Sequence, residues 1–315
     1  MRRYHPIGPL LSGEGSRAVL GLALEEGMQP QPVVIVWAAP EQIRDPVSAE
    51  RLFEETKHAV GLEHPNILRV HGMVLLAGLP ARVTAYADGE PLRRVLEVGQ
   101  RLPPALSALV LADAARGVHH AHQQGREDGT PFVHGDLRPE TLMVRFDGVC
   151  QVTGYAALGV APREVNGRRV PNRRRYNAPE QLREGREAVN VRTDVLLLGL
   201  VLHECLTGKI PFQDAPDPDE AALREALPPL PDDVPHALDA VVRKATAKRA
   251  EERYPSALAF HDALLTAVGE LPPRAALAEH LSRLFPPDNE VRKARREVIQ
   301  AGVADALERL GMLPH

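Results

Sequence analysis

Cysteine and long apolar runs are scarce in this chain of 315 residues. Its two cysteines, Cys150 and Cys205, lack the spacing of a metal site and indicate a reducing compartment rather than a disulfide-stabilised scaffold. The most apolar run, residues 195–202, is far too short to cross a membrane, and residues 1–6 lack the apolar stretch of a signal peptide. A formal net charge of -4 gives no reason to expect nucleic-acid binding. We therefore expect a cytoplasmic protein that binds neither membranes nor nucleic acid.

The composition is otherwise that of a globular protein, with 44% hydrophobic and 25% charged residues. Within residues 10–24, two short apolar stretches flank a glycine-containing turn, and the β-branched residues at 32–37 predict a strand. Residues 83–86 predict another short strand. Residues 49–62 predict a helix that ends at His64-Pro65-Asn66. The first third of the chain is therefore mostly β-structure with one helix.

Helices dominate from residue 105 onward. They are predicted at residues 105–124, 193–206, 221–227, 237–247 and 256–268. A small β-rich lobe followed by a larger helical lobe is an α+β arrangement, with a cleft between the lobes. Beyond Gly269, residues 275–285 and 289–310 are amphipathic and predict a helical tail that packs on the large lobe or on a partner.

Six motifs follow one another along the chain: residues 10–18 with Gly13 and Gly15, His64-Pro65-Asn66-Ile67, residues 132–141, Ala178-Pro179-Glu180, Asp194 with Gly199, and Arg253. In this order the motifs resemble those of eukaryotic-type serine/threonine protein kinases, which include the bacterial Hanks-type enzymes, over roughly residues 7–268. The resemblance implies a bilobal kinase fold. It also implies a buried ion pair between Glu180 and Arg253 and structural roles for Asp194 and His134.

Phosphoryl transfer requires groups that hold the phosphates, oxygen ligands for a metal and a carboxylate that orients the attacking hydroxyl. Where the family has Val-Ala-Ile-Lys, residues 33–36 are Val-Val-Ile-Val, so Val36 replaces the phosphate-holding lysine. No lysine precedes Lys57. Val34 adds two methyl groups where the family has an alanine against the adenine ring. Glu55, the helix glutamate of the family, lacks its lysine, and we expect it to be solvated or to have another role.

The glycine-rich loop keeps two of its three glycines, Gly13 and Gly15, while Ala18 replaces the third. Glycine lets a backbone approach a phosphate closely, so the loop could contact a nucleotide, but an ordinary hairpin turn explains it equally well. Arg17 in the same loop is either a substitute cation or a solvated side chain.

The catalytic loop retains Asp136 at the position of the family's catalytic aspartate, and Arg138 replaces the neighbouring lysine with another cation. Asp136 is either a catalytic base or a cap within the loop. Thr141 replaces the metal-binding asparagine, and Gly154-Tyr155-Ala156 replaces the metal-binding Asp-Phe-Gly. Because a hard cation prefers oxygen ligands, this exchange predicts that magnesium is not bound. We expect no metal and no resident cofactor, and at most weak, magnesium-independent contact of ATP with Gly13, Gly15 and Arg138.

The segment from residue 154 to 180 contains no serine or threonine, and Gly135 replaces the arginine that commonly docks a phosphorylated segment. The segment cannot therefore be switched by serine or threonine phosphorylation. It contains an arginine cluster opposed by one glutamate, Glu164: Arg163, Arg168, Arg169, Arg173, Arg174 and Arg175. The cluster is either a solvated loop or a binding surface for an acidic or phosphorylated protein.

Two histidines, His119 and His122, have a helical spacing that could ligate a metal, but no cysteine or acidic cluster supports them, and helix-surface histidines are the better interpretation. We predict a kinase-like domain at residues 1–268, with a small lobe at about 1–86 and a large lobe at about 87–268. Residues 269–315 form the helical tail. The predicted function is that of a catalytically inactive kinase homologue, a pseudokinase, that serves as a signalling adaptor or regulator of a partner protein such as an active kinase. The alternative is a serine/threonine kinase with weak or unusual ATP-dependent phosphotransfer that uses Asp136.

Overall fold

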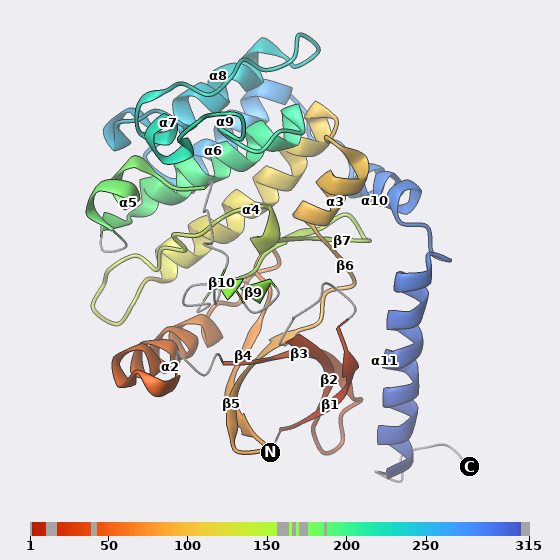
Figure 1. Ribbon diagram of the computed structural model, residues 1–315. Coiled ribbons are helices and arrows are strands. Elements are labelled where there is room, and N and C mark those ends of the chain that lie inside the picture. The colour runs from red at the N-terminus through yellow and green to blue at the C-terminus, as the bar shows by residue number, and fades with distance from the viewer. Residues whose placement is uncertain are drawn as a thin grey trace.

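The computed structural model describes residues 2–10, 18–38, 43–155, 176–185 and 188–309, together with the backbone of residues 164–165 and 168–169. A small β-rich lobe and a larger helical lobe lie one above the other, joined by the segment between β5 and β6 (Figure 1). Among the helices within these ranges, none is long and apolar enough to cross a membrane.

The small lobe is built on an antiparallel sheet in the order β1-β2-β3-β5-β4. Its strands are β1 (Arg3–Pro9), β2 (Ala18–Leu24), β3 (Gln31–Trp37), β4 (Val70–Leu76) and β5 (Leu79–Ala85). Side chains alternate between the two faces, so Val33, Ile35, Ala81 and Val83 form the core of this lobe. The sequence analysis did not predict β1. The first apolar stretch expected within residues 10–24 lies largely outside the described residues. Gly8 of β1 lies against Val298 of the tail.

Helix α2 (Pro46–Val60) packs on β4 and is the helix that the sequence predicts near residues 49–62. It begins at Asp45, whose carboxylate accepts a hydrogen bond from the Ser48 N–H at 3.1 Å. This N-cap supplies an acceptor for a backbone donor that the helix itself cannot satisfy. The helix ends at Gly61.

The large lobe is helical, as predicted. The predicted helices begin and end within a few residues of their predicted bounds: α4 (Pro104–Gln124), α6 (Val191–Thr207), α7 (Pro218–Arg224), α8 (His236–Ala245) and α9 (Ala257–Val268). Two shorter helices, α3 (Leu92–Gly99) and α5 (Pro179–Glu184), were not predicted. Within the described residues, the lobe also contains the 3-10 turns η1 (Pro139–Thr141) and η3 (Ala250–Glu252) and two small sheets. The sheets contain β6 (Gly89–Pro91), β7 (Leu142–Arg145) and β8 (Cys150–Val152), and β9 (Glu164–Val165) with β10 (Arg168–Arg169).

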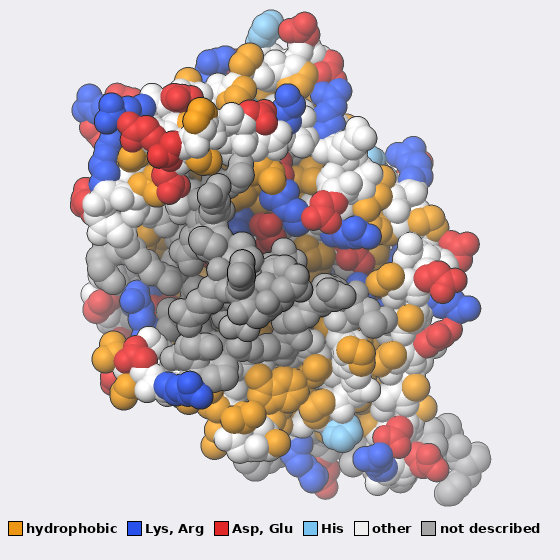
Figure 2. Space-filling view, in the orientation of Figure 1, with side chains coloured by type: hydrophobic (Ala, Val, Ile, Leu, Met, Phe, Trp, Pro, Cys, Tyr) orange, Lys and Arg blue, Asp and Glu red, His pale blue; other side chains and the backbone are white. Residues whose placement is uncertain are grey.

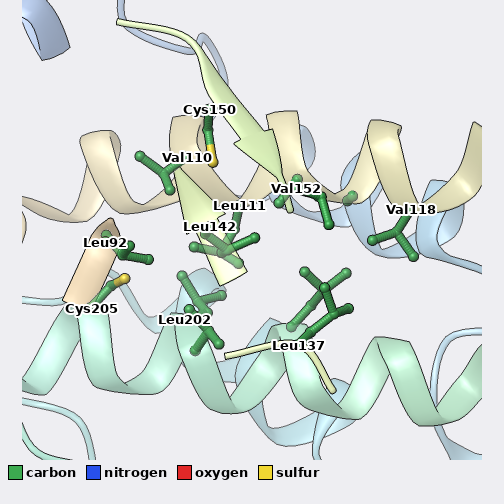
Figure 3. Packing of buried hydrophobic residues seen from close by; sticks show 14 of the residues in the cluster. Leu92, Val110, Leu111, Val118, Leu137, Leu142, Cys150, Val152, Leu202 and Cys205 are labelled. Carbon is green, nitrogen blue, oxygen red and sulfur yellow. The ribbon is translucent and has the colours of Figure 1, made fainter. Parts of the chain in front are cut away.

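Helices α4 and α6 pack against each other and form the centre of the large core. Figure 3 shows Val110 and Leu111 of α4 and Leu202 of α6 turned toward Leu142 and Val152 of the small β7–β8 sheet. The apolar run at 195–202 is therefore a buried core helix, because apolar side chains cover α6 all round. Both cysteines are buried free thiols in this core, and burial raises their pKa values well above the usual range.

The tail contacts both lobes. Helix α10 (Arg274–Leu284) packs on α3, whereas α11 (Glu290–Arg309) runs beside β1 and β2 of the small lobe (Figure 1). The prediction that the tail packs on the large lobe is therefore correct for α10 and incomplete for α11, which contacts both lobes. Arg295 explains the position of α11: its buried guanidinium pairs with Glu90 at 3.2 Å and donates to the Gly89 carbonyl. The division into units at residue 268 stays a prediction.

Candidate functional site

Val36 on β3 stands where the resemblance to kinases implies a lysine. Val36 lies on the sheet face opposite the small core, directly across from Arg82 on β5. Val34 lies on the same face, opposite Thr84. Arg82 reaches the large lobe, where its Nη1 donates to the carbonyl oxygen of Tyr155 at 3.0 Å. Burial lowers the pKa of Arg82 to about 10, so the guanidinium remains charged at neutral pH.

Glu55 on α2 is bound to the large lobe. Its Oε1 accepts from Nη2 of Arg126 at 2.8 Å, and its side chain is 15% exposed. Arg126, which follows α4, also lies over the Phe132 ring at 4.8 Å from the centroid. The hypothesis that Glu55 is solvated is therefore wrong, and the alternative that it has another role holds. Without a lysine, this glutamate ties α2 to the helical lobe.

Asp194, at the start of α6, shapes the catalytic loop. Its buried carboxylate accepts from the backbone N–H groups of His134 at 2.9 Å and Gly135 at 2.7 Å. It also accepts from Nε2 of His122 at 2.8 Å. Burial opposes ionisation of Asp194, but the hydrogen bonds and positive charge around it lower its pKa overall. The interpretation of His122 as a helix-surface histidine is wrong, because α4 turns it inward to this carboxylate.

The metal site considered for the helix histidines is not formed. In the part of the chain that the structure describes, no group of three histidine, cysteine, aspartate or glutamate side chains is arranged to hold a metal. His122 is committed to Asp194 instead, and His120 stacks on His64 with ring centroids 4.9 Å apart.

His134 is held by hydrogen bonds at both ring nitrogens. Nε2 lies 2.8 Å from the Thr153 carbonyl oxygen, which can only accept, so Nε2 carries the proton. Nδ1 then accepts from the Asp136 backbone N–H at 3.2 Å. The Tyr155 ring packs edge-on against the imidazole, with centroids 4.7 Å apart. These contacts leave the imidazole no free nitrogen with which to act as a base, consistent with the structural role that the resemblance implied.

The catalytic loop brings Asp136, Arg138 and Thr141 together. An Asp136 carboxylate oxygen lies 3.8 Å from Nη2 of Arg138, and both side chains are largely buried. The Thr141 hydroxyl accepts from the Arg138 backbone N–H and donates to the Arg138 carbonyl, each at 3.0 Å. Thr141 thus closes the loop on itself. No backbone N–H of a described residue donates to the Asp136 carboxylate, so the interpretation of Asp136 as a cap has no support there.

Gly154 has a backbone conformation that would be strained for a residue with a side chain. Its φ of +92° is one that residues with a side chain rarely adopt. A Cβ atom there would lie 3.3 Å from Nε2 of His134 and 3.3 Å from Cγ2 of Thr141. Tyr155 beside it is buried against Phe132 and His134. An aspartate at position 154 would therefore need the neighbouring side chains to move.

The predicted ion pair between Glu180 and Arg253 is present. The Arg253 guanidinium is fully buried and donates to both carboxylate oxygens of Glu180, at 2.7 and 2.9 Å. Thr193 donates to the same carboxylate at 2.7 Å. Sequence reasoning missed a second network, in which Arg93 of α3 contacts Glu140, Glu204 and the Tyr176 hydroxyl. Arg93 lies on a short helix that the sequence did not predict.

Several candidates lie outside the described residues. These are Gly13, Gly15 and Arg17 of the glycine-rich loop and Arg163, Arg173, Arg174 and Arg175 of the arginine cluster. Arg168 and Arg169 are described only by their backbone, which forms β10 opposite β9. The proposed roles of all these residues stay predictions.

Residues 9–263 match the protein-family profile described as protein tyrosine and serine/threonine kinase. This chain belongs to the protein kinase family. It is 35% identical to tyrosine-protein kinase MasK of Myxococcus xanthus and 30% identical to serine/threonine-protein kinase PknB of Mycobacterium leprae. These alignments cover 88% and 87% of this chain but 44% of each relative, so the chain spans less than half of their length.

The predicted bilobal kinase fold is also confirmed by solved structures. The kinase domain of Mycobacterium tuberculosis PknI matches with a TM-score of 0.64 over 85% of this chain and 96% of that one. Identity is 20%, so this likeness concerns the fold alone.

The described residues of this kinase homologue do not fit the magnesium ion that the family uses. Gly154 has no side-chain oxygen, and the Thr141 hydroxyl is committed to the backbone of its own loop. Magnesium demands near-octahedral oxygen coordination and is usually held by one or two carboxylates together with substrate phosphates. Of the two carboxylates in this loop, Asp136 lies next to Arg138, and Glu140 pairs with Arg93.

Proposed function

We propose that this protein kinase homologue is a pseudokinase that regulates a partner protein by binding it and does not itself transfer phosphate. The proposal rests mainly on the glycine at position 154. The metal-binding carboxylate is absent there, and the backbone conformation and the neighbours His134 and Thr141 leave little room for one. Removing a single transition-state stabiliser can cost about a hundredfold to a thousandfold in rate. Val36 removes a second such group.

The retained framework supports a binding role. The Glu180–Arg253 pair, the Asp194 contacts and the packing of Tyr155 on His134 hold the large lobe in an ordered arrangement. None of these contacts requires catalysis. A rigid surface is what a regulatory partner needs, since a preorganised surface lowers the entropic cost of association.

The alternative function, weak serine/threonine phosphotransfer, rests on Asp136. Its carboxylate is retained and lies near the cation of Arg138, which could hold a phosphate in place of the family's lysine. This alternative requires catalysis without the lysine and the metal-binding aspartate. Such losses need not multiply, because catalytic groups act as a unit, so activity must be measured rather than calculated.

Thermal unfolding with ATP, with and without magnesium, tests the loss of metal-dependent chemistry. A ligand that binds the folded state raises the apparent stability by mass action. We expect magnesium to add nothing to any shift that ATP produces. A large magnesium-dependent rise in the melting temperature would contradict the proposal. The variant Thr141→Asn with Gly154→Asp reintroduces the family's oxygen ligands and serves as the comparison.

The binding surface that we propose is the arginine cluster of residues 163–175. Guanidinium groups pair well with carboxylate and phosphate, so the partner is an acidic or phosphorylated protein, and an active kinase is one candidate. Figure 2 shows basic and acidic side chains next to one another over the helical lobe. A cluster of six arginines and one glutamate therefore differs in charge from this described surface. Binding should weaken as salt increases, since exposed charges are screened over about 8 Å at physiological ionic strength.

A comparison of two triple variants tests this surface. The first changes Arg173, Arg174 and Arg175 to alanine. The control changes three exposed arginines of the helical lobe and tail, Arg224, Arg249 and Arg283, and removes the same charge. We expect the first variant alone to lose salt-sensitive capture of partner proteins. If wild type and the first variant recover the same partners in the same amounts, the cluster is a solvated loop.

A further inference from the structure

Arg82 projects its side chain from the same face of the sheet as Val36. The two residues are direct cross-strand partners in the β3–β5 ladder. Side chains of directly opposed residues in an antiparallel pair emerge on the same face, with Cβ atoms about 5 Å apart. Ala81 and Val83, the neighbours of Arg82, point into the core of the small lobe, which confirms that Arg82 faces the other way. A cation thus stands beside the position from which the family's lysine is missing.

The guanidinium reaches the segment that replaces the metal-binding triplet. Nη1 donates to the Tyr155 carbonyl oxygen at 3.0 Å, one residue beyond Gly154. This contact spans the two lobes, because Arg82 belongs to β5 and Tyr155 follows β8. Arg82 therefore lies between the two lobes, on the face of the sheet opposite the core of the small lobe.

The positive charge of Arg82 is not neutralised by any described carboxylate. Its contact with Tyr155 is to a neutral carbonyl, and no described aspartate or glutamate pairs with it. Glu55, the helix glutamate of the family, pairs with Arg126, and position 154 has no carboxylate. Burial lowers the pKa of Arg82 to about 10, which shows that the surroundings disfavour its charge. A partly buried charge that has no acidic partner among the described residues favours the binding of an anion.

We propose that Arg82 takes over the role of the missing lysine and binds the phosphates of a polyphosphate ligand without a divalent cation. The inference deepens the proposed function, because it assigns a ligand to the cleft of a kinase homologue that does not transfer phosphate. A guanidinium presents five N–H donors and binds phosphate through two parallel hydrogen bonds, so one bond to Tyr155 leaves enough donors. The face that carries Arg82 also carries Val34 and Thr84 farther along the two strands. A nucleotide could place its base beside this pair and its phosphates at Arg82.

A purely structural role is the competing explanation, in which Arg82 does no more than tie β5 to Tyr155. Loss of the side chain would then lower stability and leave phosphate binding unchanged. Moving the cation separates the two explanations. In the double variant V36K/R82M, a lysine on β3 replaces the arginine on the paired strand, so that the charge returns to the cleft while the bond to Tyr155 is lost.

Isothermal titration in EDTA tests the assignment with ATP, inorganic tripolyphosphate and adenosine as ligands. We expect wild type to bind ATP in EDTA, and R82M to bind it about 10- to 100-fold more weakly, as is typical when a hydrogen bond to a charged group is lost. V36K/R82M should recover most of the affinity, and R82K part of it. The control R69M removes an exposed arginine paired with Glu63 and should bind as wild type does. Circular dichroism confirms that each variant is folded.

The three ligands distinguish the sources of the phosphates. Tripolyphosphate binding that R82M abolishes supports the phosphate site on its own, and tighter binding of ATP than of tripolyphosphate identifies a nucleotide as the ligand. Adenosine binding should not change in R82M. Equal affinity of R82M and wild type for ATP, or no ATP binding by wild type in EDTA, would overturn the assignment. Phosphate transfer by wild type would instead refute the proposed function and leave the role of Arg82 intact.

Discussion

Replacing Arg253 with alanine should destabilise the protein more than any loss of a surface ion pair. The Arg253 side chain has no exposed surface, and its guanidinium donates five hydrogen bonds. Two of these go to Glu180, and three go to the carbonyl oxygens of Ala247, Arg192 and Lys248. R253A therefore leaves a mostly buried carboxylate and three carbonyls without their donor.

Breaking a buried ion pair by removing one partner costs about 3–5 kcal/mol, because the remaining charge is left uncompensated. For a chain of 315 residues, that loss corresponds to a fall of roughly 5–8 °C in the melting temperature, because the entropy of unfolding grows with chain length. The matched control is R249A. Arg249 lies four residues earlier and pairs with Glu251, but its side chain is 70% exposed. An exposed pair contributes less than about 1 kcal/mol, so R249A should be close to wild type.

Urea unfolding followed by far-UV circular dichroism measures both variants, because the pair lies in the helical lobe. The expected order of stability is wild type, then R249A close behind, then R253A far below. If R253A and R249A lose the same free energy of unfolding within error, the pair does not hold Glu180, at the end of the segment from residue 154 to 180, to the rest of the large lobe, and the argument from its burial is wrong.

Three further predictions concern stability. Burial opposes ionisation of Glu180, but the hydrogen bonds from Arg253 lower its pKa below the usual 4.5. The stability that ionised Glu180 contributes should therefore be complete above pH 4.5 and lost on further acidification. Urea titrations from about pH 6 to pH 3 should show that the free energy of unfolding changes less steeply with pH in R253A than in wild type. A double-mutant cycle of E55A and R126A should give a coupling free energy of about 1 kcal/mol or more, and additive losses would show that α2 is not tied to the large lobe. R295A should cost about 3 kcal/mol and speed hydrogen exchange in β1, whereas unchanged exchange would mean that α11 is not anchored by Glu90.

The sequence predicted the helices of the large lobe well, because their apolar runs end at proline-rich segments. The resemblance to kinases also located Glu180, Arg253 and Asp194, since these belong to recognisable motifs. Helix α3 was missed because it is short, although Leu92, Val95 and Leu96 have the spacing of one apolar helix face. The motifs thus predicted the structural residues of the site, and the apolar pattern predicted the core helices.

The contacts of Arg82 and His122 could not be predicted, because they depend on pairing between segments that are distant in the sequence. Arg82 faces the cleft because β3 and β5 pair in one register, and a shift of one residue would turn it into the core. His122 is buried because α4 and α6 cross where it meets Asp194. Neither the register of β3 and β5 nor the crossing of α4 and α6 can be predicted from the local sequence. A charged residue within an otherwise apolar strand was the available signal for Arg82.

Phosphate transfer from radiolabelled ATP tests the central claim most directly. Wild type and D136N are compared with magnesium and with manganese, both for self-labelling and for a generic basic substrate. Because Val36 and Gly154 replace the family's lysine and metal-binding aspartate, we predict that wild type incorporates no more label than D136N. Turnover by wild type that D136N abolishes would contradict the account and show that this kinase homologue is an active enzyme with Asp136 as its base.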